Sequence, residues 1–224
     1  MRGDAILFSE MTPDPSFEAD FHDWYDNEHI PLRMDAPGFV SAQRYARTDG
    51  VGYLAIYEMD QVSALKTSVY EKIKQEPSER TRRMLQNVSG FTRYTGQTIS
   101  IVENAAGTLE FDRAPFLYAV WFDVPPSGAS EFDDWYDQEH VPMLMKSPDW
   151  LQVRRFQVVD GAPLPYTRLA LHYLANEAAL DSPERAAARK TPWRDRLAER
   201  PWFKGHYSLF TKHKGRQSGR RTEP

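Results

Sequence analysis

Short apolar segments alternate with amphipathic, largely acidic segments along the chain, and the same order occurs twice. Each half predicts a strand, a helix, two more strands, a second helical region and a last strand. The predicted ranges are 5–11, 17–30, 38–47, 52–59, 61–87 and 91–102 in the first half, and 116–124, 129–141, 150–159, 167–174, 176–199 and 203–212 in the second.

Turn residues separate these elements in both halves. Pro31 and Pro142 are expected to end the first helix of each half, because proline cannot continue the helical hydrogen-bond ladder. The pairs Asp49-Gly50 and Asp160-Gly161 indicate hairpins between the second and third strands. The two halves therefore share their turns as well as their strands and helices.

An internal repeat explains this symmetry. Residues 21–31 and 132–142 agree at eight of eleven positions, at an offset of 111, and twice this offset covers nearly all 224 residues. We therefore expect a first repeat at 1–104, a linker at 105–115, a second repeat at 116–211 and a basic flexible tail at 212–224.

The order β-α-β-β-α-β defines a ferredoxin-like unit of the α+β class. Its sheet carries helices on one face only, so the other face has to be buried elsewhere. Two sheets packed face to face on one chain meet this need. The sequence thus predicts two ferredoxin-like repeats that form an intrachain α+β barrel, a pseudo-dimer.

Charge and composition limit the function classes. The net charge is −4, from 28 Lys+Arg and 32 Asp+Glu. The tail from Lys212 has five basic residues and one acid, a charge of +4, so the rest of the chain carries −8. An acidic body argues against nucleic-acid binding. The absence of cysteine excludes disulfides and thiol nucleophiles and favours a cytoplasmic location. No run of 18 apolar residues occurs, so the sequence predicts no membrane-spanning helix.

The repeated motif Trp-Tyr-Asp-x-Glu-His-x-Pro, at 24–31 and 135–142, resembles the EthD-like branch of the dimeric α+β barrel superfamily. The resemblance covers nearly all residues through about 211. It implies a small-molecule pocket between the sheet and the helices of each repeat, and it allows a homodimer of the pseudo-dimeric chain. The superfamily includes polyketide cyclases, muconolactone isomerases, dehydratases, cofactor-independent monooxygenases and haem-dependent enzymes, so the fold does not determine the reaction.

The motif also places acid–base groups together. On an α-helix, residues three and four apart share a face. This spacing aligns a histidine, a carboxylate and a phenol in each repeat: His29, Asp26 and Tyr25 in the first, and His140, Asp137 and Tyr136 in the second. The helix dipole and the nearby acids favour a protonated histidine with a pKa at or somewhat above about 7, which suits general acid–base catalysis.

A structural interpretation of the motif is also open. In it, His29 and His140 cap the end of the helix. Trp24 and Trp135 pack in the core, and the two motif glutamates, Glu28 and Glu139, bind backbone N–H groups of the following loop. If the motif is functional instead, these tryptophans and glutamates line the substrate site.

Further candidates lie on the strands. Arg44 and Arg155 either clamp an anionic substrate or pair with a motif acid, and the ion pair is favoured. The remaining substrate-binding candidates are Tyr57 and Tyr94 in the first repeat and His172 and His206 in the second. Because these differ, the two pockets are not expected to be equivalent. A His22-x3-Asp26-x2-His29 spacing occurs only in the first repeat and is weak evidence for a metal, so we expect neither metal nor cofactor.

These observations favour a cofactor-independent lyase or isomerase, of the dehydratase or cyclase type. Its substrate would be a small cyclic, aromatic or polyketide-like oxygenated metabolite. One alternative is an oxidoreductase of the same fold, either a cofactor-free monooxygenase or a haem enzyme. Another is a non-catalytic small-molecule-binding or stress-response barrel.

Overall fold

The computed structural model describes residues 3–50 and 52–219. Its strands are hydrogen-bonded in the order β1-β3-β2-β8-β5-β7-β6-β4, a closed barrel. This order confirms the predicted α+β barrel within one chain. The chain divides into two compact units. The first comprises Met1–Gln97, Val159–Pro163 and His213–Pro224, and the second comprises Thr98–Val158 and Leu164–Lys212.

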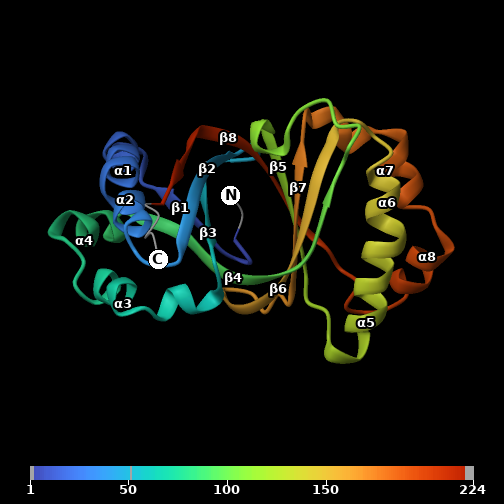
Figure 1. The fold of residues 1–224 in the computed structure, drawn as a ribbon, viewed down its shortest axis with the longest axis horizontal. Helices are drawn as coiled ribbons and strands as arrows, with labels where there is room; N and C mark the ends of the chain where they lie inside the picture. The colour runs from blue at the N-terminus through green and yellow to red at the C-terminus, as the bar shows by residue number, and fades with distance from the viewer. Residues whose placement is uncertain (1–2, 51, 220–224) are drawn as a thin grey trace. The chain divides into compact units, whose positions relative to one another are not determined.

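In the first unit, helices cover one side of strands β1 to β3 (Figure 1). The apolar core between them includes Leu7, Phe21, Trp24 and Tyr57. The elements are β1 (Ala5–Pro13), η1 (Pro15–Phe17), α1 (Glu18–Trp24), η2 (Tyr25–His29), α2 (Ile30–Met34), β2 (Phe39–Arg47), β3 (Tyr53–Met59), η3 (Val62–Lys66), α3 (Ser68–Gln75), α4 (Glu79–Gln86) and β4 (Val88–Glu103).

The second unit repeats this order. Its elements are η4 (Phe111–Arg113), β5 (Phe116–Phe122), α5 (Pro126–Trp135), η5 (Tyr136–His140), α6 (Val141–Leu144), β6 (Trp150–Ala162), β7 (Arg168–Leu174), η6 (Glu177–Asp181), α7 (Pro183–Ala188), α8 (Pro192–Ala198) and β8 (His206–Ser218). The ends of β6 and β8 belong to the first unit, and the end of β4 belongs to the second. Leu7 pairs with Tyr57, and Tyr118 pairs with His172 at the same place in the second unit. This common register makes residues of the two units comparable one by one.

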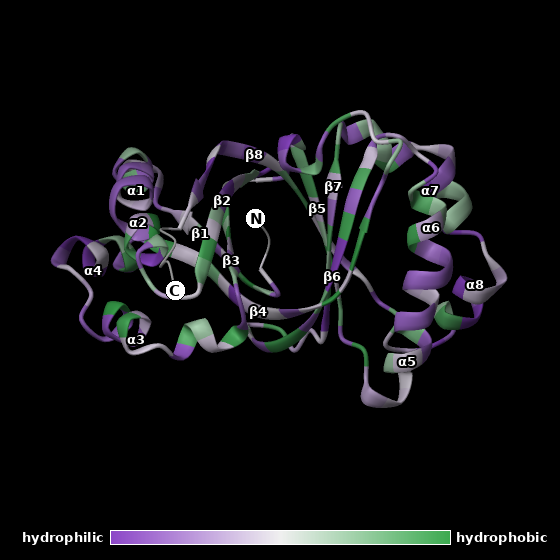
Figure 2. Ribbon diagram, viewed as in Figure 1, coloured by the Kyte–Doolittle hydropathy of each residue, from purple (hydrophilic) through white to green (hydrophobic). Residues whose placement is uncertain are grey.

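Hydropathy follows the arrangement of the elements. Figure 2 shows hydrophobic residues along the strands, whereas the short helix α4 is mainly hydrophilic. Among the described residues, no helix is long and apolar enough to cross a membrane.

The repeated motif is a π-helical turn in both units, not α-helix as the sequence suggested. The N–H of Ile30 bonds to the carbonyl of Tyr25, and that of Val141 bonds to Tyr136, five residues back. Pro31 then falls in the first turn of a new α-helix, where a missing N–H costs nothing. The prediction that Pro31 and Pro142 end the helix is therefore wrong, because helix continues to Met34 and Leu144.

Two predictions for the ends of strands also need correction. Asp160-Gly161 does not form a tight hairpin, since β6 extends through both residues to Ala162. Residues 212–218 of the expected flexible tail are the end of strand β8. They are held because the Gln43 side chain donates to the Lys214 carbonyl at 3.0 Å and Gly219 N–H donates to Val40 at 2.8 Å. Residues 220–224 lie outside the described residues.

A buried arginine fixes the motif helix to its sheet in each unit. The Arg44 side chain is 3% exposed, and its guanidinium lies 4.5 Å from the ring centre of Tyr25 and donates to Asp26 at 2.7 Å. Arg155, 2% exposed, lies 4.6 Å from Tyr136 and 2.7 Å from Asp137. Asp26 and Asp137 therefore neutralise a buried charge, and the two arginines are not placed to clamp a ligand.

The motif glutamate and tryptophan connect the first helix of each unit to its last one. Glu28 accepts a hydrogen bond from the Thr81 hydroxyl at 2.9 Å, and Trp24 donates to the same hydroxyl at 3.0 Å. Glu139 accepts from Trp135 at 3.1 Å and from Thr191, the N-cap of α8, at 2.5 Å. The expected partners were backbone N–H groups, but the structure shows side-chain hydroxyl groups of the last helix.

The ion pair of Arg44 predicts a large stability effect. In Asp26→Ala the buried guanidinium loses its carboxylate, so we expect the free energy of unfolding to fall by about 3 kcal/mol. Urea denaturation measures this change. The control is Asp23→Ala. Asp23 lies at the end of α1, three residues before Asp26, and pairs with Arg80 at the surface, so its loss should lower the free energy of unfolding much less. Equal losses in the two variants would contradict the anchoring role of Asp26.

Candidate functional site

A groove of about 680 Å³ lies between the sheet and helices α2, α3 and α4 of the first unit. We call it the first-unit groove. A pocket between sheet and helices is what the family resemblance implies. The residues that line it include Leu7, Ser9, Met11, His29, Leu32, Arg33, Tyr57, Val69, Tyr70, Lys72, Ile73, Lys74, Thr81, Leu85, Phe91 and Arg93.

Large apolar side chains are exposed around this groove. Leu32, Val69, Leu85 and Phe91 line it and are between 43% and 50% exposed. Apolar side chains gathered in this way on a folded surface are typical of a ligand site. The first-unit groove thus has the size and lining of a site for an apolar ligand with rings.

His29 is a buried, neutral histidine on the wall of this groove. It is 5% exposed, and its ring centre lies 4.2 Å from that of Trp24 and 4.7 Å from that of Tyr25. Burial, with the charges of Arg33 and Arg44, holds its pKa well below the usual value. The expected pKa near or above 7 is wrong, because desolvation dominates and Asp26 bonds to Arg44. His29 also lies within the helix and does not cap its end.

A cation and a phenol accompany His29. Arg33, one turn further along, donates to the His29 carbonyl at 2.8 Å, and its guanidinium lies 5.7 Å from the ring centre of Tyr57. The Tyr57 hydroxyl is buried beside Tyr25 without a well-formed hydrogen bond. A neutral imidazole can accept a proton, and an arginine can stabilise the oxyanion that results. The wall therefore combines a base with an anion-stabilising cation.

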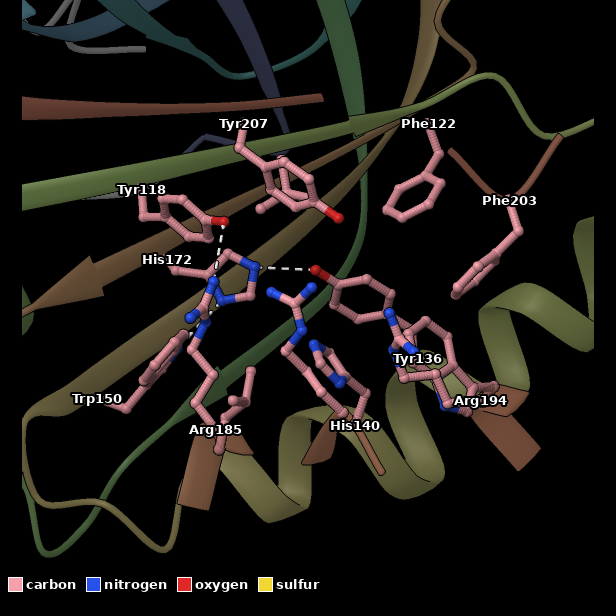
Figure 3. A pocket seen from close by; sticks show the side chains of 14 residues that line it. Tyr118, Phe122, Tyr136, His140, Trp150, His172, Arg185, Arg194, Phe203 and Tyr207 are labelled. Carbon is pink, nitrogen blue, oxygen red and sulfur yellow. Dashed lines mark hydrogen bonds between the residues drawn. The ribbon is translucent and has the colours of Figure 1, made fainter. Parts of the chain in front are cut away.

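The same place in the second unit holds a cavity of only about 40 Å³ (Figure 3). Larger side chains fill it: Tyr118 in place of Leu7, Phe122 in place of Met11, and Trp150 in place of Phe39. A cavity of this size has room for about three water molecules and cannot hold a porphyrin. The two pockets are thus not equivalent in size.

Hydrogen bonds fix the tautomer of His172 in this cavity. Trp150 donates its indole N–H to Nδ1 at 3.0 Å, so Nδ1 carries no proton. Burial lowers the His172 pKa well below the usual value, so the ring is neutral. Its proton is therefore on Nε2, which donates to the Tyr136 hydroxyl at 2.9 Å (Figure 3). The hydroxyl proton of Tyr136 consequently points away from His172.

His140, the counterpart of His29, is also neutral. Its ring centre lies 4.7 Å from that of Trp135, and burial lowers its pKa to about 3. Its Nδ1 is buried without a well-formed hydrogen bond. Neither motif histidine is thus the protonated acid that the sequence suggested.

Three other predicted groups do not reach either pocket. Tyr94 pairs with Phe8 on the sheet face away from the helices. His206 is exposed, packs on Tyr166, and pairs with Trp121, so it is not the counterpart of Tyr94. The Nδ1 atom of His22 lies 2.8 Å from Nη2 of Arg44. In the described part of the chain, no group of three or more His, Asp or Glu side chains is placed to hold a metal.

Sequence reasoning missed several residues of the first-unit groove. Arg33 follows the motif directly, and Val69, Ile73 and Leu85 are apolar positions in otherwise polar helices. Their signal in the sequence is the apolar face that these positions form on α3 and α4. Only the structure shows that part of this face is open.

Solved structures of similar fold are known, although no protein-family model and no curated protein matches the sequence. A protein described as anthrone oxidase-like superposes with a TM-score of 0.71 at 12% identity, over 98% of this chain and 95% of that one. A Fusobacterium nucleatum protein provisionally described as a monooxygenase superposes with a TM-score of 0.58 at 11% identity, over 99% of this chain and 100% of that one. A mutant chlorite dismutase from Candidatus Nitrospira defluvii, in complex with cyanide, superposes with a TM-score of 0.55 at 10% identity, over 94% of this chain and 90% of that one.

These likenesses show that the chain has the dimeric α+β barrel fold. At such identities they show the fold alone. The resemblance to the EthD-like branch stays a prediction, and the neighbours do not support the lyase or isomerase assignment.

The buried neutral His172 predicts a pH dependence of stability. The pKa of His172 is lowered in the folded protein. The contribution of its neutral ring to the free energy of unfolding is therefore complete above about pH 6.5 and is lost as the pH falls from there. Between pH 6.5 and 5.5, the unfolding free energy of His172→Gln should therefore fall by about 1 kcal/mol less than that of the wild type. Urea denaturation at both pH values measures it, with the exposed His206→Gln as control. Parallel losses in His172→Gln and the wild type would contradict the prediction.

Proposed function

We propose that the chain is a cofactor-independent oxidoreductase that acts on ring-containing, oxygenated aromatic compounds in the first-unit groove. The observation that carries this proposal is the neutral His29 beside Arg33 on the wall of an apolar groove of about 680 Å³. The descriptions of two structural neighbours, anthrone oxidase-like and monooxygenase, support oxidation over the lyase or isomerase reaction. The motif supports a place in the EthD-like branch.

The chemistry uses an acidic substrate. An anthrone has a methylene group that a ring ketone acidifies. His29 would accept a proton from this carbon while Arg33 stabilises the enolate oxygen. The carbanion then reduces dioxygen, in the balance R2CH2 + O2 → R2C=O + H2O. One oxygen atom enters the new carbonyl and the other leaves as water, and the substrate supplies all four electrons, so no cofactor is needed.

A haem enzyme is the second candidate. His29 is the one histidine that lines the first-unit groove in the described residues, so it is the residue that would hold the haem iron. Lys72 and Lys74 line the same groove and could pair with the propionates. Haem would supply one-electron and oxygen chemistry. A Soret band in purified protein that His29→Gln abolishes would favour this candidate.

His29 should be essential for turnover. In His29→Gln the proton acceptor is lost, so kcat/KM for an anthrone should fall by about 100-fold or more. Oxygen uptake and the visible absorption of the quinone product measure turnover, with EDTA present. The matched control is His140→Gln in the second unit, which should stay within about twofold of the wild type.

The pH profile separates a neutral base from a structural histidine. Because the pKa of His29 is lowered, the base stays active as the pH falls, and the acid limb of kcat/KM should lie below about 6.5. Full turnover in His29→Gln, or equal losses in His29→Gln and His140→Gln, would overturn the proposed role of His29.

A further inference from the structure

Three arginines of the second unit line both its small cavity and an open groove beside it. Arg185 lies in α7, Arg189 follows that helix, and Arg194 lies in α8. The open groove has a volume of about 450 Å³ and is also lined by Lys190 and Asp181. The two spaces share all three arginines and therefore adjoin each other, and we call them together the arginine site.

The arginine site has an uncompensated positive charge. Four cations and one acid line the open groove, an excess of three charges, and no acid lines the inner cavity. Among the described residues, none of these four cations is within 4.0 Å of a carboxylate oxygen. By contrast, Arg155 and Arg168 of the same unit both bind Asp133. A cluster of unpaired cations on a chain of net charge −4 points to an anionic ligand.

Parts of the site are held in place without a ligand. Arg185 donates to the Leu180 carbonyl at 2.5 Å and to the Tyr118 hydroxyl at 3.5 Å. The Arg194 guanidinium lies 5.8 Å from the ring centre of Phe203. Figure 3 shows Arg185 and Arg194 at the cavity together with Tyr118. Cations ordered in this way lose little entropy when they bind an anion.

The inner cavity adds polar groups whose bonds are incomplete. The hydroxyl proton of Tyr136 is available, because that oxygen accepts its bond from His172. The His140 ring lines the same cavity and is paired with the Ala188 backbone, but its Nδ1 is buried without a well-formed hydrogen bond. The arginines also contribute to the lowered pKa of His140, which agrees with a positive potential there. A buried polar group without a partner costs stability unless a ligand or water completes it.

We infer that the arginine site binds a phosphate-type oxyanion, either pyrophosphate or the phosphate of a small ester. A charge excess of three suits a di- or trianion better than a carboxylate of charge −1. The cavity of about 40 Å³ accepts a group of a few heavy atoms. The open groove of about 450 Å³ leaves space for the rest of an ester. This inference is independent of the function proposed for the first-unit groove.

Isothermal titration calorimetry with pyrophosphate, phosphate and acetate at constant ionic strength tests the inference. We expect saturable binding in the order pyrophosphate, phosphate, acetate. Arg189→Gln and Arg194→Gln should each lower the affinity for pyrophosphate about tenfold. Arg189 is exposed, so its replacement does not endanger folding, which thermal unfolding without ligand verifies. The control is Arg196→Gln, an exposed arginine of α8 that does not line the site.

Three results would overturn the inference. These are no saturable binding of pyrophosphate, acetate binding as tightly as pyrophosphate, or an equal loss of affinity in Arg196→Gln and Arg194→Gln. The oxidation of anthrones plays no part in this titration, so either proposal can fail without the other.

Discussion

The structure depends on a buried guanidinium in each unit. Arg44 and Arg155 lie on a strand beneath the motif helix, nearly inaccessible to water. Each charge needs a carboxylate and a stacking partner close by, and the motif supplies both: Asp26 with Tyr25, and Asp137 with Tyr136. The conspicuous acid of the motif therefore holds the helix on the sheet. It is not available to polarise a histidine.

The π-helical turn separates the anchoring residues from the histidine. Because the bonded groups are five residues apart, the histidine lies against the tryptophan at the start of the motif. Both units share this arrangement, yet among the described residues a large groove adjoins the motif histidine in the first unit, whereas a cavity of only about 40 Å³ adjoins it in the second. The motif alone therefore does not determine the chemistry, which depends also on the side chains around it. Leu7 and Met11 leave open the space that Tyr118 and Phe122 fill.

Much of this architecture could be read from the sequence, because the offset of 111 and the order of elements depend on local patterns. What failed depends on tertiary contacts. The π-turn packs against Arg44, and Pro31 falls in the first turn of the helix that follows it. The pKa of His29 is governed by a burial that no spacing reveals. Arg185 and Arg189 are four residues apart at the end of α7, and this spacing is a signal that the sequence does contain.

The neutral histidines restrict the chemistry of both units in different ways. A buried imidazole with a low pKa is a weak base, so a substrate must be acidic before it can lose a proton to one. In the first unit Arg33 can increase that acidity by stabilising the anion. In the second unit Leu144 replaces Arg33, and the cations come instead from α7 and α8, beside a cavity too small for a ring system. One duplicated fold thus offers a base with a single cation for making an anion, and a cluster of cations for holding an anion already formed.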